Sequence, residues 1–151
     1  MITIKNTQRK IAVNTRKVIG DSEKMLKALG YESFDFGIWF TTNQTIRRFN
    51  KKYRNTNKPT DILSFPYHYN LKPGEKIKVA GPDDKNLGDL IISLEYVKVN
   101  AKKTWNRSFD EHLTALIAHG IAHLLGYDHI TDNESELMQK IEKKLRKAIL
   151  S

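Results

Sequence analysis

The sequence contains no cysteine in its 151 residues. Disulfide bonds and thiolate metal ligands are therefore excluded, and any metal must be held by nitrogen and oxygen atoms. The chain also lacks long apolar segments. No run approaches the roughly eighteen apolar residues of a membrane span, and the first residues show no secretory signal. We therefore expect a globular protein in a reducing compartment, with no membrane partner.

Acidic residues are scarce as well. The chain has 26 Lys and Arg residues against 17 Asp and Glu residues, which gives a net charge of +9. No acidic residue precedes Asp21, although several lysines and arginines do. Positive charge favours polyanionic partners, and nucleic acid is the commonest of these in a cell. Basic surfaces also serve plain solubility, so charge alone leaves both interpretations open.

Length and hydrophobic periodicity predict one α/β (α+β) domain covering residues 1–151. Alternating apolar residues predict strands at 2–4, 11–13, 34–42, 60–65 and 87–93. Helical spacing predicts helices at 18–29, 43–53, 94–101, 108–125 and 133–150. We expect a small mixed sheet of about four strands packed with about five helices.

Capping residues and turn residues mark the ends of these elements. Asn43 is expected to cap one helix, and Ser108 with Glu111 has the spacing of a capping box. In the last helix, Leu137 is expected to lie on the inward apolar stripe. Residues 67–86 form a long basic loop with turn signals, which predicts a flap or a partner-binding segment.

Three histidines within eleven residues carry the clearest chemistry. His119 and His123 are four residues apart, so their imidazoles point the same way from a helix. Gly126 can end that helix in a left-handed conformation, and the chain then presents His129. Two ligands from a helix and one from a loop leave a fourth position open, as in catalytic zinc sites. We expect one Zn²⁺ per chain at the end of this buried helix. Nickel, copper or iron could occupy the same ligands in vitro.

The spacing of these histidines is that of the long metalloprotease motif H-E-x-x-H-x-x-G-x-x-H. Gly120 stands where that motif places its general-base glutamate. The absence of an acidic residue on this turn and the basic net charge argue against a protease.

Two neighbouring residues have open roles. His112 lies on the same helix face as His119 but about 10 Å away along the axis, so it cannot bind the same ion. It is expected to line a substrate groove, or else to be a capping-turn or surface residue. Asp128 could orient an imidazole, accept a proton from a metal-bound water, or simply shape the turn. We favour the orienting or structural role.

The string from His119 to His129 resembles the signature of the YbeY family of zinc-dependent endoribonucleases, the ribosomal RNA maturation factors. Further blocks agree with the family in order: Phe36–Ile38, Asn50–Arg54, Pro59–Pro66 and Leu87–Ser93. The stretches Phe65–His68 and Leu71–Glu75 are similar to organelle-type, eukaryotic members.

This resemblance implies zinc ligation by His119, His123 and His129, with His119 among the catalytic residues. It implies an RNA substrate, chiefly the ribosomal RNA precursor, and a role in 16S-type 3′ end processing and ribosome quality control. It also implies contacts with the ribosome or small-subunit proteins. The resemblance further implies that Arg54 takes part in the activity and that Asp61 lies near the substrate groove. A guanidinium can stabilise charge on phosphoryl oxygens, although Arg54 could instead be a phosphate-positioning or solvated cation.

The expected reaction is metal-assisted hydrolysis of single-stranded RNA. With no glutamate at position 120, the substrate phosphate, Asp128 or a second water could accept the proton. The alternative is a non-enzymatic ribosome-assembly factor that carries a zinc site. A bacterial member would be cytoplasmic and an organelle-type member mitochondrial.

Overall fold

The computed structural model describes residues 1–151 as one mixed sheet with five α-helices. The strands are β1 (Ile2–Asn6), β2 (Asp35–Thr41), β3 (Ile62–Pro66) and β4 (Asn86–Ser93). They lie in the order β1-β2-β4-β3. β1, β2 and β4 are parallel, and the edge strand β3 runs antiparallel to β4. This confirms the predicted fold class.

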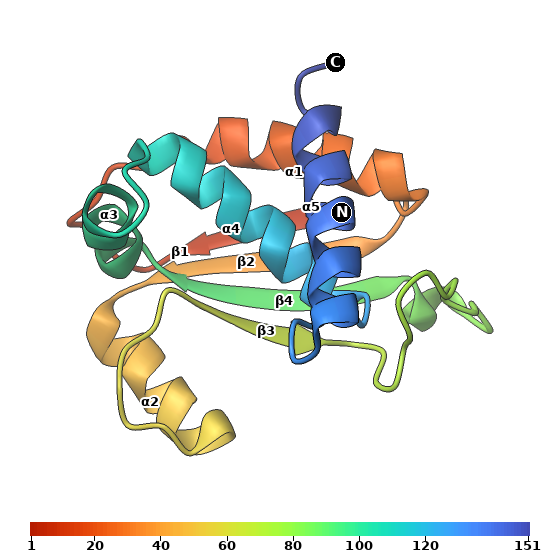
Figure 1. Ribbon diagram of the computed structural model, residues 1–151, viewed down its shortest axis with the longest axis horizontal. Helices are drawn as coiled ribbons and strands as arrows, with labels where there is room; N and C mark the ends of the chain where they lie inside the picture. The colour runs from red at the N-terminus through yellow and green to blue at the C-terminus, as the bar shows by residue number, and fades with distance from the viewer.

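The helices are distributed unequally over the two faces of the sheet. They are α1 (Thr15–Leu29), α2 (Asn43–Arg54), α3 (Leu94–Lys103), α4 (Phe109–Leu124) and α5 (Asp132–Ala148). α1, α4 and α5 lie on one side of the sheet, whereas α2 alone lies on the other side, near one end (Figure 1). A short 3-10 helix, η1 (Pro82–Asp84), precedes β4. No helix has both the length and the apolar character needed to cross a bilayer.

Strand register assigns side chains to the two faces, because neighbouring residues point in opposite directions. Ile38 pairs with Leu90, and both belong to the main core beneath α1 and α4. The adjacent pair, Trp39 and Ile91, faces α2 in a much smaller apolar cluster. One face of the sheet is thus well covered and the other only partly.

Helix α4 lies unusually close to the sheet at Gly120. A Cβ atom at this position would lie 2.7 Å from both Leu90 methyl carbons and 2.8 Å from Cδ1 of Ile62. Such distances are shorter than normal carbon–carbon contacts of about 3.5–4 Å. Glycine therefore allows the helix to rest directly on β4 and β3.

Three local predictions are wrong. Residues Ile11 to Val13 form no strand, because the buried Gln8 side chain both accepts from Ile11 N and donates to Ile11 O, each at 2.9 Å. Thr42, not Asn43, caps α2, with its hydroxyl accepting from Thr45 N. Leu137 is 46% exposed rather than inward.

The capping prediction for α4 is confirmed in its position and differs in its bonding. Ser108 Oγ accepts a hydrogen bond from Glu111 N at 3.2 Å. The Glu111 carboxylate accepts from the Ser108 hydroxyl at 2.9 Å, rather than from the backbone N–H of a capping box. The helix that carries the histidines therefore begins at Phe109.

The loop before β4 packs against the end of α4. Leu71 and Ile77 lie against the main core, and Ile77 N donates to the Tyr31 hydroxyl at 3.2 Å. Gly126, with φ +92°, lies so close to this loop that a Cβ atom would overlap the carbonyl oxygen of Leu71. The loop thus contacts the turn that leads to His129.

We expect Gly126→Ala to destabilise the protein by about 2–4 kcal/mol, because alanine disfavours positive φ and would displace the Leu71 backbone. Urea unfolding followed by circular dichroism measures this. Gly20→Ala in α1 is the matched control, since Gly20 has open space around its Cβ position. It should stabilise the helix by about 0.5–1 kcal/mol. Equal stability of Gly126→Ala and wild type would contradict the account.

Candidate metal centre

Three histidine side chains meet at the end of α4. His119 and His123 lie on the last turns of the helix, and His129 lies in the loop that follows. The Nε2 atoms of His119 and His123 are 3.1 Å apart. One ligand atom from each of the three histidines lies within 4.8 Å of the others. The predicted triad is therefore assembled.

The arrangement of the triad fits a tetrahedral metal. With metal–nitrogen bonds of about 2.0–2.1 Å, two ligand nitrogens at a tetrahedral ion lie about 3.3–3.4 Å apart. The 3.1 Å separation between His119 and His123 is close to this value. Three imidazoles form a donor set that zinc and several other transition metals accept. These residues could hold one metal ion and leave a position open for water or substrate.

Burial keeps one ligand in its metal-binding form. Desolvation, and after it the charge of the neighbouring His119, lowers the pKa of His123 to about 4. Its imidazole is therefore neutral at pH 7, with a lone pair available for a metal.

A carboxylate that the sequence analysis did not single out orients the first ligand. Nδ1 of His119 lies 3.1 Å from Oε1 of Glu142 on α5. If Nδ1–H donates to this carboxylate, Nε2 is left to face the metal, as in many zinc sites. One sequence signal was available: Glu142 follows Met138 by four residues and precedes Leu145 by three. It is an acidic residue on the apolar stripe of α5.

The hydrogen bond of Asp128 agrees with one of its predicted roles, that of shaping the turn. Its Oδ1 accepts a hydrogen bond from the backbone N–H of His129 at 2.8 Å. In the preceding turn, Gly126 N donates a hydrogen bond to His123 O and Tyr127 N donates one to Ala122 O, both at 3.1 Å. Asp128 therefore fixes the backbone that presents the third histidine, and no imidazole is among its hydrogen-bond partners.

The triad opens onto a cleft of about 550 Å³. Six of the predicted site residues line it: Arg54, Asp61, His119, His123, Asp128 and His129. Arg54 reaches the cleft from the end of α2, and its Nη2 donates to Ser64 O on β3 at 3.0 Å. Asp61, just before β3, uses Oδ1 to accept from Ile62 N at 2.7 Å. The fold thus brings a cation and two carboxylates to the same cleft as the histidines.

His112 lies in an adjoining cavity of about 380 Å³, which also contains Asp61, His119 and Glu142. Its side chain is buried, so the alternative of a surface histidine is wrong. Neither ring nitrogen has a hydrogen-bond partner. Burial lowers the pKa of His112, the charge of Arg107 lowers it further, and Asp61 acts in the opposite direction. This places the ring beside the cleft and outside the triad.

Comparison with known proteins agrees with this geometry. The family model described as "Endoribonuclease YbeY" matches residues 3–150. A Homo sapiens protein named endoribonuclease YbeY is 39% identical over 142 residues, covering 94% of this chain and 84% of its own. The protein of that name from Bartonella quintana is 38% identical, covering 96% and 91% of the two chains. Bacterial and human relatives match at similar identity, so the organelle-type resemblance stays a prediction.

The fold has a counterpart among solved structures. A protein from Thermotoga maritima, solved in solution, superposes with a TM-score of 0.57 at 22% identity. The match covers 96% of this chain and 89% of the other. This likeness supports the arrangement of strands and helices.

We expect Glu142→Ala to weaken metal binding about 10- to 100-fold, because His119 loses the group that orients it. Glu142→Gln should lose less, since the amide oxygen still accepts a hydrogen bond. Competition with a chromophoric chelator measures the affinity. Glu136→Ala, an exposed position on the same helix, is the control and should bind as wild type. Equal affinities for Glu142→Ala and Glu136→Ala would remove Glu142 from the site.

Proposed function

Because this chain belongs to the YbeY endoribonuclease family, we propose that it is a zinc-dependent endoribonuclease that cleaves single-stranded RNA. The observation that carries the proposal is the shared cleft. His119, His123 and His129 open onto the cavity that Arg54 also lines. A metal-binding triad and a guanidinium in one cleft are suited to phosphodiester hydrolysis.

His119, His123 and His129 would hold the zinc ion, one per chain. When bound, zinc acts as a Lewis acid toward a phosphoryl oxygen and lowers the pKa of a bound water. Glu142 keeps His119 in the required orientation through the contact at Nδ1. Asp128 holds the loop that carries His129. These residues preorganise the ligands before substrate arrives.

Arg54 is the residue that stabilises charge on the substrate. Hydrolysis develops negative charge on the phosphoryl oxygens, and a guanidinium can donate two parallel hydrogen bonds to them. Ser64 O already orients the Arg54 side chain by accepting one N–H at 3.0 Å, and the other N–H groups remain for a phosphate. The cleft also offers the carboxylates of Asp61 and Asp128 as acceptors for the proton of an attacking water.

The preferred substrate in this proposal is the ribosomal RNA precursor, processed at its 16S-type 3′ end. The net charge of +9 supports a polyanionic substrate. A role in ribosome quality control, contacts with small-subunit proteins, and a cytoplasmic or mitochondrial location follow from the family resemblance.

We expect His119→Ala to abolish RNA cleavage and Arg54→Ala to lower kcat about 10²- to 10³-fold, because the first removes a metal ligand and the second a transition-state contact. Arg54→Lys should recover only part of the loss, since an ammonium cannot donate bidentately. The assay follows cleavage of an end-labelled single-stranded RNA in metal-controlled buffer. Arg48→Ala, on the outer surface of the same helix as Arg54, is the control and should retain activity.

Undiminished cleavage by His119→Ala would contradict the proposed function, because the activity would then belong to a contaminating nuclease. Wild-type protein that binds RNA and cannot cleave it with zinc present would favour the non-enzymatic assembly factor.

A further inference from the structure

The face of the sheet away from α1, α4 and α5 carries a second and larger hollow, of about 620 Å³. α2 covers only one end of this face (Figure 1). We call it the aromatic groove, after the five aromatic residues that line it: Trp39, Phe49, Tyr53, Phe65 and Tyr69. None of them is fully buried. The groove is therefore an open apolar surface that the chain itself does not fill.

The aromatic side chains form a continuous series. Trp39 and Phe49 meet edge to face with ring centres 5.4 Å apart. Phe49 and Tyr53 are nearly parallel at 6.1 Å, and Tyr53 meets Phe65 edge to face at 5.3 Å. Tyr53 is 50% exposed and Tyr69 is 79% exposed, so ring surface is available to a ligand. Exposed aromatic surface of this kind is the platform on which single-stranded nucleic acids stack their bases.

Cations accompany these rings. The Lys5 ammonium lies over Trp39 at 4.5 Å, and the Lys52 ammonium lies over Tyr53 at 5.2 Å. The guanidinium of Arg54 lies 5.9 Å from the Phe65 ring. Each cation contacts a ring that lines the groove, and Lys5 also lines the groove itself. Cations beside exposed rings are the combination with which proteins bind the phosphates and bases of single-stranded nucleic acids.

One row of residues across the sheet contributes to the floor of the groove. Thr3, Gly37, Asp89 and Phe65 are register partners across the sheet in one row. Gly37 has no side chain, and the Asp89 carboxylate lies across it. Asp89 forms no hydrogen bond or ion pair within the chain. Its charge repels phosphates from the floor, and its oxygens can accept from base amino groups. A bound strand would therefore turn its bases inward.

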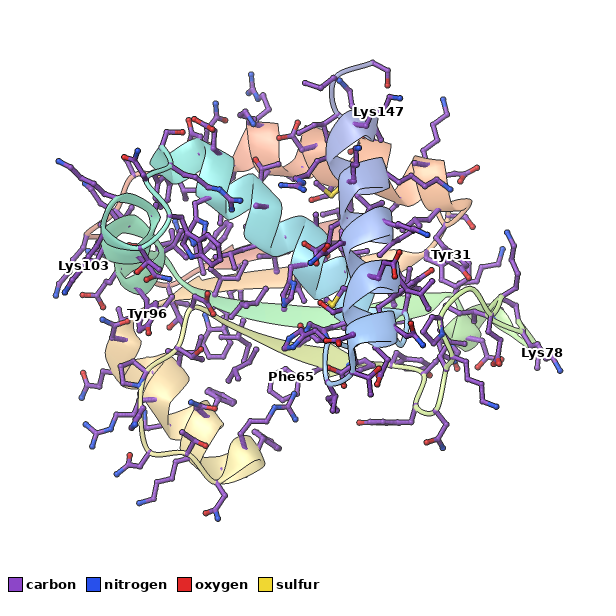
Figure 2. The ribbon with its side chains drawn as sticks, in the orientation of Figure 1. Tyr31, Phe65, Lys78, Tyr96, Lys103 and Lys147 are labelled. Atoms are coloured by element: carbon purple, nitrogen blue, oxygen red, sulfur yellow. The ribbon has the colours of Figure 1, made fainter.

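The groove is continuous with the metal cleft around the edge strand β3. Tyr69 lines both cavities, and Arg54 lines the cleft while facing the Phe65 ring of the groove. Side chains alternate along the strand, so Ser64 faces the cleft and Phe65 faces the groove. In Figure 2, Phe65 lies below the sheet, on the side opposite Lys147 of α5. A chain crossing β3 at Arg54 could occupy both sites.

Resting on the function proposed above, we propose that the aromatic groove binds the bases of single-stranded RNA next to the scissile phosphodiester. Nucleotides beyond the cleft pass over the edge of β3 and stack on Tyr69, Phe65, Tyr53 and Trp39. Lys5, Lys52 and Arg54 contact their phosphates. The positive rim favours a polyanion over an apolar protein segment, which would leave these cations without partners.

Fluorescence anisotropy of metal-loaded protein with a labelled 2′-O-methyl RNA of about a dozen nucleotides tests this proposal. Gel electrophoresis afterwards verifies that the RNA is intact. Tyr69→Ala and Trp39→Leu should each weaken binding about 10-fold, because each removes a stacking surface. Tyr69→Phe should bind as wild type, since it keeps the ring. Lys5→Ala should lower affinity and its salt dependence. Lys147→Ala, on the opposite side of the sheet, is the charge-matched control.

A labelled RNA trimer separates the groove from the cleft, because it is too short to reach both. Its affinity for the cleft should be unchanged by Lys5→Ala, because Lys5 lines the groove and not the cleft. If Trp39→Leu unfolds, Lys5→Ala still decides, because Lys5 is exposed and lines the groove alone. Groove variants that bind the longer RNA within about two-fold of wild type would overturn the proposal and leave the groove to a protein partner. If the groove variants bind RNA more weakly but the wild-type protein does not cleave RNA, the groove is an RNA-binding site and the proposed endoribonuclease function is wrong.

Discussion

The contact between helix α4 and the sheet at Gly120 is the constraint on which the metal centre depends. A side chain at this position would displace the terminal methyl groups of Leu90 and Ile62, and glycine lets the helix rest directly on the strands without that displacement. With residue 120 turned toward the sheet, His119 and His123 open onto the cleft beside β3. The geometry also accounts for the missing protease glutamate: residue 120 is directed at the sheet, where a catalytic carboxylate would be buried among methyl groups.

The local parts of this site follow from sequence. Helix geometry alone brings His119 and His123 together, and Gly126 predicts the turn that presents His129. The sequence marks Glu142 only as an acidic residue on the apolar stripe of α5. Its pairing with His119 has no local signal, because it depends on the packing of α5 on α4, 23 residues further along the chain. Likewise, periodicity predicted a strand at Ile11, but a hydrogen bond from a buried glutamine side chain overrides it. The Glu142 contact is tertiary, whereas the Gln8 bonds reach only three residues along the chain and show that a local side-chain hydrogen bond can override strand periodicity.

Edge strand β3 connects the two surfaces that the account assigns to RNA. Its side chains alternate between the metal cleft and the aromatic groove, and Arg54 lies at the boundary between them. An RNA chain held on both sides of one strand would place a phosphodiester beside the histidine triad with little freedom to move. Positioning of this kind is a large part of catalysis in phosphoryl transfer.

The dependence of catalysis on the histidine triad can be measured by adding zinc in steps to metal-free protein and following the rate of single-stranded RNA cleavage. We expect the rate to rise in proportion to zinc and to stop rising at one ion per chain, because His119, His123 and His129 would hold a single ion. Cleavage at full rate by the metal-free protein would contradict this expectation.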